Sequence, residues 1–528
     1  MGHSISAFNG PGFGMPESVD HHPVVIIGSG PTGMTAALLL AQYGISCSIM
    51  DRWEGVYPQP RAVHMDDEVC RILGGLGLAE EFAAISRPAR GLQLVDRRLT
   101  TLAVFDRDPD LRPHGFPQAN MFDQPDLEHL MRSRLSSLAG VHMAGGCTVV
   151  DVANRRDHCV VTYLDTRTGE RCAVTADYVL GCDGANSTVR SSIGSRMLDL
   201  GFEQRWLVID IATEPELDLW EGVHQVCDTE RAATYMRIGH TRHRWEFRLR
   251  DTETADDFDD LDSVRPLLTP WLGTADRDAL HLIRSTEYTF RARVVDRWRD
   301  RRIFVLGDAA HLTPPFIGQG MGAGVRDAMN LVWKLVGVMN GSFADDTLDS
   351  YEAERKPHVT SSIRLAVAIG RAMTGGGAIT DAVRKSVAPV LGHLPMIGAQ
   401  VTDSTSPRLS PSNFVTRKVL SRGLAGSLCP NAVVDRGRRV DDVAPGCFLF
   451  VSTTPLTREQ NTEVVRRGAT ALEVPQSSEL GMWLHRRRAN AAIVRPDRTV
   501  MAAGRSVPSL HTRLPNCAYR IVRSSGDR

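Results

Sequence analysis

The chain has 528 residues, of which 42% are hydrophobic and 23% are charged, and this ordinary composition excludes a disordered or fibrous protein. The 61 basic and 62 acidic residues nearly cancel, so the net charge does not favour nucleic-acid binding. No apolar run reaches about 18 residues, so we expect no membrane association through a spanning segment. The ten cysteines lack C-x-x-C or zinc-ligand spacing, which is typical of reduced thiols in the cytoplasm.

Residues 1–22 are rich in glycine and polar side chains and lack the basic and apolar regions of a signal peptide, so we expect a disordered tail. Gly2 and Ser6 fit the loose pattern for N-myristoylation, which a glycine-rich tail explains equally well. We therefore expect the folded chain to begin at Pro23.

The segment PVVIIGSGPTGMTAALLLAQYGISCSIMD predicts a buried strand, a tight turn, an apolar helix and a second strand. Gly28, Gly30 and Gly33 form G-x-G-x-x-G within this unit, and Asp51 ends the second strand. Such glycines allow a pyrophosphate to approach the backbone, and the acidic residue accepts a hydrogen bond from a ribose hydroxyl. The unit therefore predicts a dinucleotide site, but it does not separate NAD from FAD.

Further along the chain, the spacing of apolar residues and the local composition divide the sequence into further regions. Residues 201–297 contain short, partly alternating segments that predict an antiparallel sheet for substrate binding, inserted into the α/β unit of residues 23–200 and 298–400. The second half of that unit ends in a helical extension. Residues 401–422 are rich in serine and proline and predict a linker, and residues 423–528 then form a separate domain.

Two later turns carry acidic residues directly after predicted strands. They are YVLGCDGANSTVR, with Asp183 and Arg190, and GDAAHLTPP, with Asp308. A dinucleotide with both a ribose and a ribityl chain would use Asp51 and Asp308 together. This favours FAD, although either later turn could be only a turn.

The stretch GDAAHLTPPFIGQGMGAGVRDAMNLVWKL brings a stiff and nearly bare backbone to the start of a helix. Pro314 and Pro315 stiffen the approach, and Gly318, Gly320 and Gly322 leave it without side chains. The N–H groups of a helix N-terminus attract negative charge, so this backbone suits a large, electron-rich group.

Together, GSGPTG, GCDGANSTVR and the proline-glycine stretch resemble the single-component FAD-dependent aromatic hydroxylases of the para-hydroxybenzoate hydroxylase fold. The segments PRAVHMDDEVCRI, NMFDQPDLEHLMRSRL and HRWEF are most similar to the branch that hydroxylates 3-(3-hydroxyphenyl)propionate and 3-hydroxycinnamate. The resemblance implies an α/β fold: a Rossmann-like FAD domain, an inserted antiparallel substrate sheet and a thioredoxin-like C-terminal domain. The last domain has no C-x-x-C, so we expect a packing or oligomer role there, with a homodimer as one possibility.

The resemblance also implies the chemistry. NADH or NADPH reduces FAD, O₂ forms a C4a-hydroperoxide, and one oxygen atom enters a small phenol, ortho or para to its hydroxyl. Our first choice of substrate is 3-(3-hydroxyphenyl)propionate. The alternatives are a larger polyketide-like phenol, an FAD-dependent dehydrogenase that does not use oxygen, and a flavin-bound sensor or assembly protein.

The expected site residues fall into three groups, and no metal ligands are expected. Candidates near the reacting atoms are His311, Pro314 and Pro315. Candidates for the substrate pocket are Arg244, Trp245, Phe247 and Phe316, with Glu246 and Trp206 as further guesses. Candidates for cofactor binding are Gly28, Gly30, Gly33, Asp51, Arg61, Gln124, Asp183, Arg190, Asp308, Gly318, Gly320, Met321 and Gly322.

Overall fold

The computed structural model describes residues 20–517 except 58–60, 109, 214–216, 218, 229, 240, 274–276, 375–406 and 417–422. Most of the predicted tail, the end of the helical extension and much of the predicted linker lie outside the described residues. Within the predicted tail, His21 and His22 already belong to the first strand. The folded chain therefore begins slightly earlier than the sequence predicts.

A largely parallel sheet forms the first layer, with strand order β17-β18-β11-β1-β2-β8. β9 and β10 extend it by antiparallel pairing through β11. Its strands are β1 (His21–Ile27), β2 (Cys47–Met50), β8 (Val141–Ala144), β9 (Cys147–Asn154), β10 (Cys159–Asp165), β11 (Arg171–Gly181), β17 (Arg299–Asp300) and β18 (Ile303–Val305). The apolar residues Val24–Ile27 are almost fully buried, as expected for a strand covered on both faces.

Helices α1 (Pro31–Gln42) and α7 (Gly320–Met339) pack together against this sheet. Pro31 occupies the start of α1, where its missing N–H has no helical acceptor in any case. The two helices approach so closely that a Cβ atom at Gly324 would lie only 2.2 Å from the Thr32 hydroxyl oxygen. Glycine in α7 therefore permits the packing that brings its N-terminus beside the G-x-G-x-x-G turn.

The second large sheet is mainly antiparallel, with strand order β19-β16-β12-β15-β14-β13-β5-β6. Its strands are β5 (Gly91–Val95), β6 (Thr101–Asp106), β12 (Met197–Thr213), β13 (Val223–Val226), β14 (Ala233–Ile238), β15 (Arg242–Arg248), β16 (Leu280–Val295) and β19 (His311–Leu312). β5, β6 and β19 lie outside residues 201–297, so three chain segments build the sheet that the sequence assigned to one. α6 (Leu261–Leu272) covers one face.

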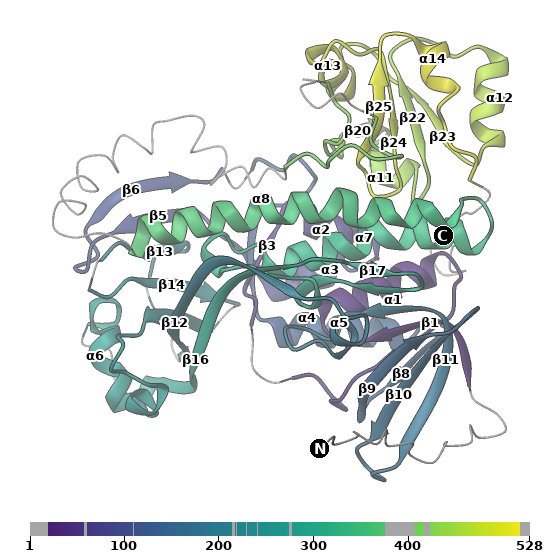
Figure 1. Cartoon of the computed structure of the whole chain (residues 1–528). Coiled ribbons are helices and arrows are strands. Elements are labelled where there is room, and N and C mark those ends of the chain that lie inside the picture. The colour runs from purple at the N-terminus through teal and green to yellow at the C-terminus, as the bar shows by residue number, and fades with distance from the viewer. Residues whose placement is uncertain are drawn as a thin grey trace, which may run out of the picture.

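The remaining helices of this region connect the two sheets. They are α2 (Asp67–Gly75), α3 (Ala79–Ile85), α4 (Gln124–Ser136), α5 (Thr188–Ser192) and α8 (Asp349–Thr374). A small sheet of β3 (His64–Asp66), β7 (Ala119–Phe122) and β4 (Ser86–Pro88) lies among them. Figure 1 shows α8 crossing the molecule, with the C-terminal domain on one side and the parallel sheet on the other. Among the described helices, none combines the length and apolar character needed to cross a bilayer.

The C-terminal domain has its own core and a four-stranded sheet of order β23-β22-β24-β25. β22 and β23 are parallel, whereas β24 is antiparallel to β22 and to β25. Its elements are β20 (Val433–Asp435), β21 (Arg438–Arg439), α11 (Val440–Val443), β22 (Leu449–Ser452), α12 (Arg458–Arg466), β23 (Thr470–Glu473), α13 (Glu479–Arg486), β24 (Ala491–Val494), β25 (Val500–Gly504) and α14 (Val507–His511). We propose a thioredoxin-like fold for this domain from that order.

Candidate active site

One cavity of about 700 Å³ extends from the first turn of the parallel sheet to the second sheet. Its lining includes ten of the residues predicted to hold the cofactor, which come from five separate regions of the chain. They are Gly28, Gly30, Asp51, Arg61, Gln124, Asp183, Asp308, Gly318, Gly320 and Met321. Cavities of this size are typical of cofactor and small-molecule sites. The structure therefore brings most of the dispersed motifs to one place.

Asp51 lies at the nucleotide end of the cavity and is tied to the glycine turn. Its Oδ2 accepts hydrogen bonds from the backbone N–H of Ser29 at 2.6 Å and from the Ser29 hydroxyl at 2.9 Å. Arg132, on α4, donates to the same hydroxyl at 2.6 Å. The carboxylate and the guanidinium thus lie where a ribose hydroxyl and a pyrophosphate would need an acceptor and a positive charge.

Gly28 and Gly33 shape this turn in different ways. Gly28 has a φ of 101°, and a Cβ there would lie 2.3 Å from the carbonyl oxygen of Cys182. A Cβ at Gly33 would lie 2.0 Å from the carbonyl oxygen of Gly28, so Gly33 lets α1 pack against the turn. Of these two glycines only Gly28 lines the cavity.

Gln124 and Arg61 lie along the wall between the two ends. The Gln124 side-chain oxygen accepts the backbone N–H of Ala62 at 2.7 Å, which holds the segment beneath Arg61. The Arg61 guanidinium lies over the Tyr57 ring, 5.4 Å from its centroid. Gln124, at the start of α4, and Arg61, in a loop, thus keep an amide and a cation beside the cavity.

The two acidic turns play different parts. Asp183 accepts from the Ser187 hydroxyl at 2.6 Å and from the Val189 N–H at 3.1 Å, so it supports the start of α5. Asp308 lines the cavity. Desolvation by the surrounding protein raises the pKa of its carboxyl, because the ionised form loses hydration. Asp308 is therefore the better placed of the two to accept a hydrogen bond from a polyol.

Arg190 and Gly322 do not line the cavity. The Arg190 guanidinium donates to the carbonyl oxygens of Ala309 at 3.1 Å and Ala185 at 2.9 Å, which ties the two acidic turns together. A Cβ at Gly322 would meet the Arg326 guanidinium at 2.9 Å. Both residues support the wall of the site from behind, and direct cofactor contact is not retained for either.

The proline-glycine stretch forms the centre of the cavity wall. Pro315 and Phe316 line it, whereas Pro314 does not, and Gly318 adopts a left-handed φ of 62°. α7 then begins at Gly320, where the first backbone N–H groups have no acceptor within the helix. A bare backbone that ends in a helix N-terminus fits the electron-rich edge of a flavin ring, and with Asp51 and Asp308 these residues fit FAD.

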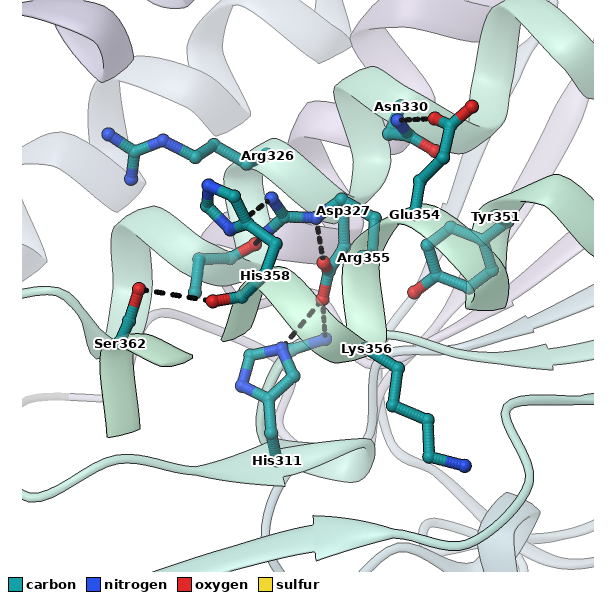
Figure 2. Close-up of polar contacts among 12 residues, drawn as sticks. His311, Arg326, Asp327, Asn330, Tyr351, Glu354, Arg355, Lys356, His358 and Ser362 are labelled. Atoms are coloured by element: carbon teal, nitrogen blue, oxygen red, sulfur yellow. Dashed lines mark hydrogen bonds and ion pairs between the residues drawn. The ribbon is translucent and has the colours of Figure 1, made fainter. Parts of the chain in front are cut away.

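His311 does not line the cavity, which corrects its predicted position beside the reacting atoms. Its ring is fully buried, and Nε2 lies 2.7 Å from Asp327 Oδ2. Figure 2 shows His311 and Arg355 reaching Asp327 from two sides. Burial alone would raise the pKa of Asp327, but the charges of His311 and Arg355 outweigh it and the pKa is lowered. His311 therefore positions the loop, since Asp327 also accepts the Gly307 N–H at 3.0 Å.

The second sheet closes the opposite end, and only one of its β15 residues reaches the cavity. Glu246 lines the wall, whereas Trp245 and Phe247 face the core beneath α6. Arg244 shares the face of Glu246 but is held by Asp210, with Nε 2.7 Å from its Oδ1. Of the four β15 residues predicted for the substrate pocket, Glu246 lines this cavity, whereas Arg244, Trp245 and Phe247 do not.

Phe316 keeps its predicted place at the cavity wall. Trp206 lies behind it, fully buried, with the two ring centroids 5.7 Å apart in an edge arrangement. Trp206 therefore supports the wall and does not form it.

The sequence reading did not single out His64, Arg132 or the Gln225–Thr234 pair, all of which line the cavity. His64 Nδ1 lies 3.3 Å from the carbonyl oxygen of Gly318. Burial, followed by the charge of Arg107, lowers the pKa of His64 to about 4, so the ring is neutral near pH 7. The only sequence signal was its place inside PRAVHMDDE, beside a residue already expected at the cofactor.

Replacing Gly320 by valine should weaken FAD binding by about tenfold or more, equivalent to about 1.4 kcal/mol. Apart from its chain neighbours and its own helix backbone, no described atom lies closer than 4.0 Å to a Cβ built at Gly320, so the branched side chain would occupy cavity space needed by the ligand. Fluorescence titration with FAD measures the affinity, and a thermal melt of the apoprotein measures the fold.

Gly324→Val is the matched control. The added Cβ would lie 2.2 Å from Thr32 Oγ1, inside the α1–α7 contact. We expect this variant to lower stability by about 1–3 kcal/mol before any effect on the ligand appears. Equal FAD affinity in Gly320→Val and the unmodified protein would place the loop away from the flavin.

Comparison with known proteins agrees with the geometry. A sequence profile of the family described as "FAD binding domain" matches residues 21–366. A probable NADH-specific resorcinol 4-hydroxylase of Rhodococcus jostii is 33% identical over 529 residues, covering 96% of each chain. A 3-(3-hydroxy-phenyl)propionate/3-hydroxycinnamic acid hydroxylase of Burkholderia cenocepacia is 28% identical over 517 residues, covering 91% of this chain and 93% of the relative.

Solved structures support the same fold. The flavin-dependent monooxygenase PieE, in complex with FAD and substrate, aligns with a TM-score of 0.79 at 22% identity and covers 94% of this chain and 99% of its own. Aklavinone-11 hydroxylase with FAD and aklavinone aligns with a TM-score of 0.78 at 20% identity, over 95% of this chain and 99% of its own. The chain therefore belongs to the FAD binding domain family and is a flavoprotein aromatic monooxygenase that uses FAD and a reduced nicotinamide.

Proposed function

We propose that this enzyme uses NADH to hydroxylate a small, single-ring phenol that carries a second substituent meta to its hydroxyl. The observation that carries the proposal is the continuity of one cavity from the Asp51 turn to Gln225, Thr234 and Glu246 on the second sheet. FAD, when bound, would supply the transfer of electrons from NADH to O₂. The chain's own residues bind it, orient the ring and exclude water from the space between the two sheets.

The names of two relatives support the choice of a meta-substituted phenol. One is named for resorcinol and the other for 3-(3-hydroxy-phenyl)propionate, and in both molecules the second substituent is meta to a hydroxyl. The solved structures match at only 20% to 22% identity, so their titles support the fold and carry no argument about the substrate of this chain. NADH is preferred over NADPH because the relative that covers 96% of the chain is named as NADH-specific.

The proposal also includes the cytoplasmic location and the homodimer expected from the sequence. All ten cysteines lie in the described part of the chain and none is in a disulfide, which supports a cytoplasmic location. A homodimer is proposed on the resemblance alone, and sedimentation of the purified protein would test it.

Labelling with ¹⁸O₂ tests the proposed reaction. With resorcinol or 3-(3-hydroxyphenyl)propionate, we expect one labelled oxygen in the product for each NADH consumed. The para isomer, 3-(4-hydroxyphenyl)propionate, is the matched control and should consume NADH mainly with release of hydrogen peroxide. Label that arrives from water, or full turnover without oxygen, would contradict a monooxygenase reaction.

A further inference from the structure

Glu246 lies in the middle of β15, within a row of polar side chains that crosses three strands. Its backbone partner is Thr234 in β14, and the partner of Thr234 in β13 is Gln225. All three line the cavity, and Glu246 is only 7% exposed. A largely buried carboxyl group therefore lies in the cavity wall on the second sheet, whereas the Asp51 turn follows a strand of the first sheet.

The other members of the row already have partners. The Thr234 hydroxyl donates to the Gln225 side-chain oxygen at 2.9 Å, and the Gln225 amide donates to the carbonyl oxygen of Ala233 at 2.9 Å. The backbone of Glu246 pairs with β12 and β14, but within the described residues its carboxyl group makes no hydrogen bond to the protein. Buried carboxyl oxygens normally have partners, so this one is available to a ligand.

A group of buried charges lies behind Glu246. Asp210 on β12 accepts from Arg244 at 2.7 Å and lies 2.8 Å from the guanidinium of Arg284 on β16. Two arginines and one aspartate leave one positive charge, which an ionised Glu246 balances. Burial raises the pKa of Glu246, Arg244 and Arg284 oppose that rise, and Asp210 adds to it. The group is thus a stronger base than an ordinary carboxylate while its ionised form remains compensated.

We propose that Glu246 is the catalytic base that accepts the phenolic proton of the substrate, an inference that rests on the proposed function. The phenolic O–H bond breaks, the proton moves to a Glu246 oxygen, and the electron pair stays on the substrate oxygen and enriches the ring. One atom of O₂ enters the ring as a hydroxyl and the other leaves as water, using a hydride from NADH, one proton from the solvent and the proton that the attacked carbon releases. The attacked carbon then loses its hydrogen as a proton, the substrate oxygen regains one, and Glu246 ends ionised.

His64 is another titratable group at the cavity wall, and it suits this role less well. Its pKa is lowered to about 4, so its ring would hold a transferred proton weakly. Its contact with the Gly318 carbonyl at 3.3 Å also places it beside the proline-glycine stretch. His64 therefore suits orientation of the ring, whereas Glu246 suits proton transfer.

The test compares Glu246→Gln and Glu246→Asp with the unmodified enzyme, using resorcinol and 3-(3-hydroxyphenyl)propionate. Glu246→Gln should slow ring hydroxylation about a hundredfold, which is typical for loss of a general base. NADH would then be consumed with release of hydrogen peroxide. Because the base must be ionised, product formation in the unmodified enzyme should fall as the pH drops through the pKa of Glu246. This fall in product formation at low pH should be absent in Glu246→Gln and present again in Glu246→Asp.

Glu203→Gln is the matched control, since Glu203 lies on neighbouring β12 with its side chain half exposed and paired to Arg291 at 2.9 Å. It should leave coupling and the pH profile unchanged. FAD absorbance reports that each variant is folded and loaded. Normal labelling with unchanged coupling in Glu246→Gln would overturn this inference alone. Absence of labelled product from the unmodified enzyme would overturn the proposed function and this inference together.

Discussion

Replacing Arg495 with methionine should lower the free energy of unfolding by about 3–5 kcal/mol, the range expected when one partner of a buried ion pair is removed. Arg495 lies at the end of β24, and its side chain is fully buried. Its guanidinium donates to both oxygens of Glu354 on α8, at 2.8 and 2.9 Å, and to Asp497 at 3.0 Å. Methionine would leave both carboxylates short of their compensating charge.

The same network of buried charges reaches α7, the helix that begins at Gly320. Lys334 on α7 lies 2.9 Å from Glu354, and the Arg495 guanidinium lies 5.3 Å from the centroid of the Trp333 ring. Figure 2 shows Asn330 of α7 bonded to Glu354 as well. Lys334 and Arg495 therefore balance Glu354 and Asp497, and the C-terminal domain is joined to the FAD domain through buried charge. This contact supports the packing role predicted for that domain.

The matched control is Arg466→Met on α12 of the same domain. Arg466 pairs with Glu463 at 2.6 Å, but its side chain is 63% exposed, so its removal should cost no more than about 1 kcal/mol. Thermal and urea unfolding of the two variants, followed by FAD fluorescence and by circular dichroism, measures the difference. Similar midpoints for the two variants would show that the buried network contributes little to stability.

Asp51→Ala should weaken FAD binding by about one to two orders of magnitude, because a hydrogen bond to a charged group contributes roughly 1.5–3 kcal/mol. The structure adds a second reason. Asp51 also accepts the Ser29 N–H and the Trp53 N–H, at 2.6 and 2.9 Å, so it holds the turn on which the nucleotide would lie. Fluorescence titration of the apoprotein with FAD measures the loss.

Ser29→Ala separates the two contributions. It removes the hydroxyl that donates to Asp51 at 2.9 Å and accepts from Arg132 at 2.6 Å, but it leaves the carboxylate and both backbone contacts in place. We expect a smaller loss than in Asp51→Ala, about tenfold, because each hydrogen bond contributes about 1 kcal/mol and the Arg132 guanidinium stays available to the ligand. If Asp51→Ala bound FAD as tightly as Ser29→Ala, the carboxylate would have no direct role at the ribose.

Local signals in the sequence predicted the FAD cofactor, and most of the residues that carry those signals line one cavity. Gly28, Asp51 and Gly318 are informative in sequence because each requirement is local: a positive φ, the end of a strand, the approach to a helix. The thioredoxin-like assignment and the domain limits stay predictions. Residues such as Arg132 carry no local signal, since α4 is brought to the Ser29 turn only by the sheet.

By itself the sequence predicted a dinucleotide site and favoured FAD, because backbone turns and helix ends are encoded within short segments. Hydroxylation of a phenol came from the resemblance of those segments to the aromatic hydroxylases. The tertiary structure decided which side chains face the cavity. HRWEF predicts a strand correctly, yet the side chains of a strand alternate, and only the packing of α6 against Trp245 and Phe247 turns Glu246 toward the cavity. The orientation of the His311 ring likewise depends on Asp327, sixteen residues away, because a buried polar ring points toward a partner for its nitrogen.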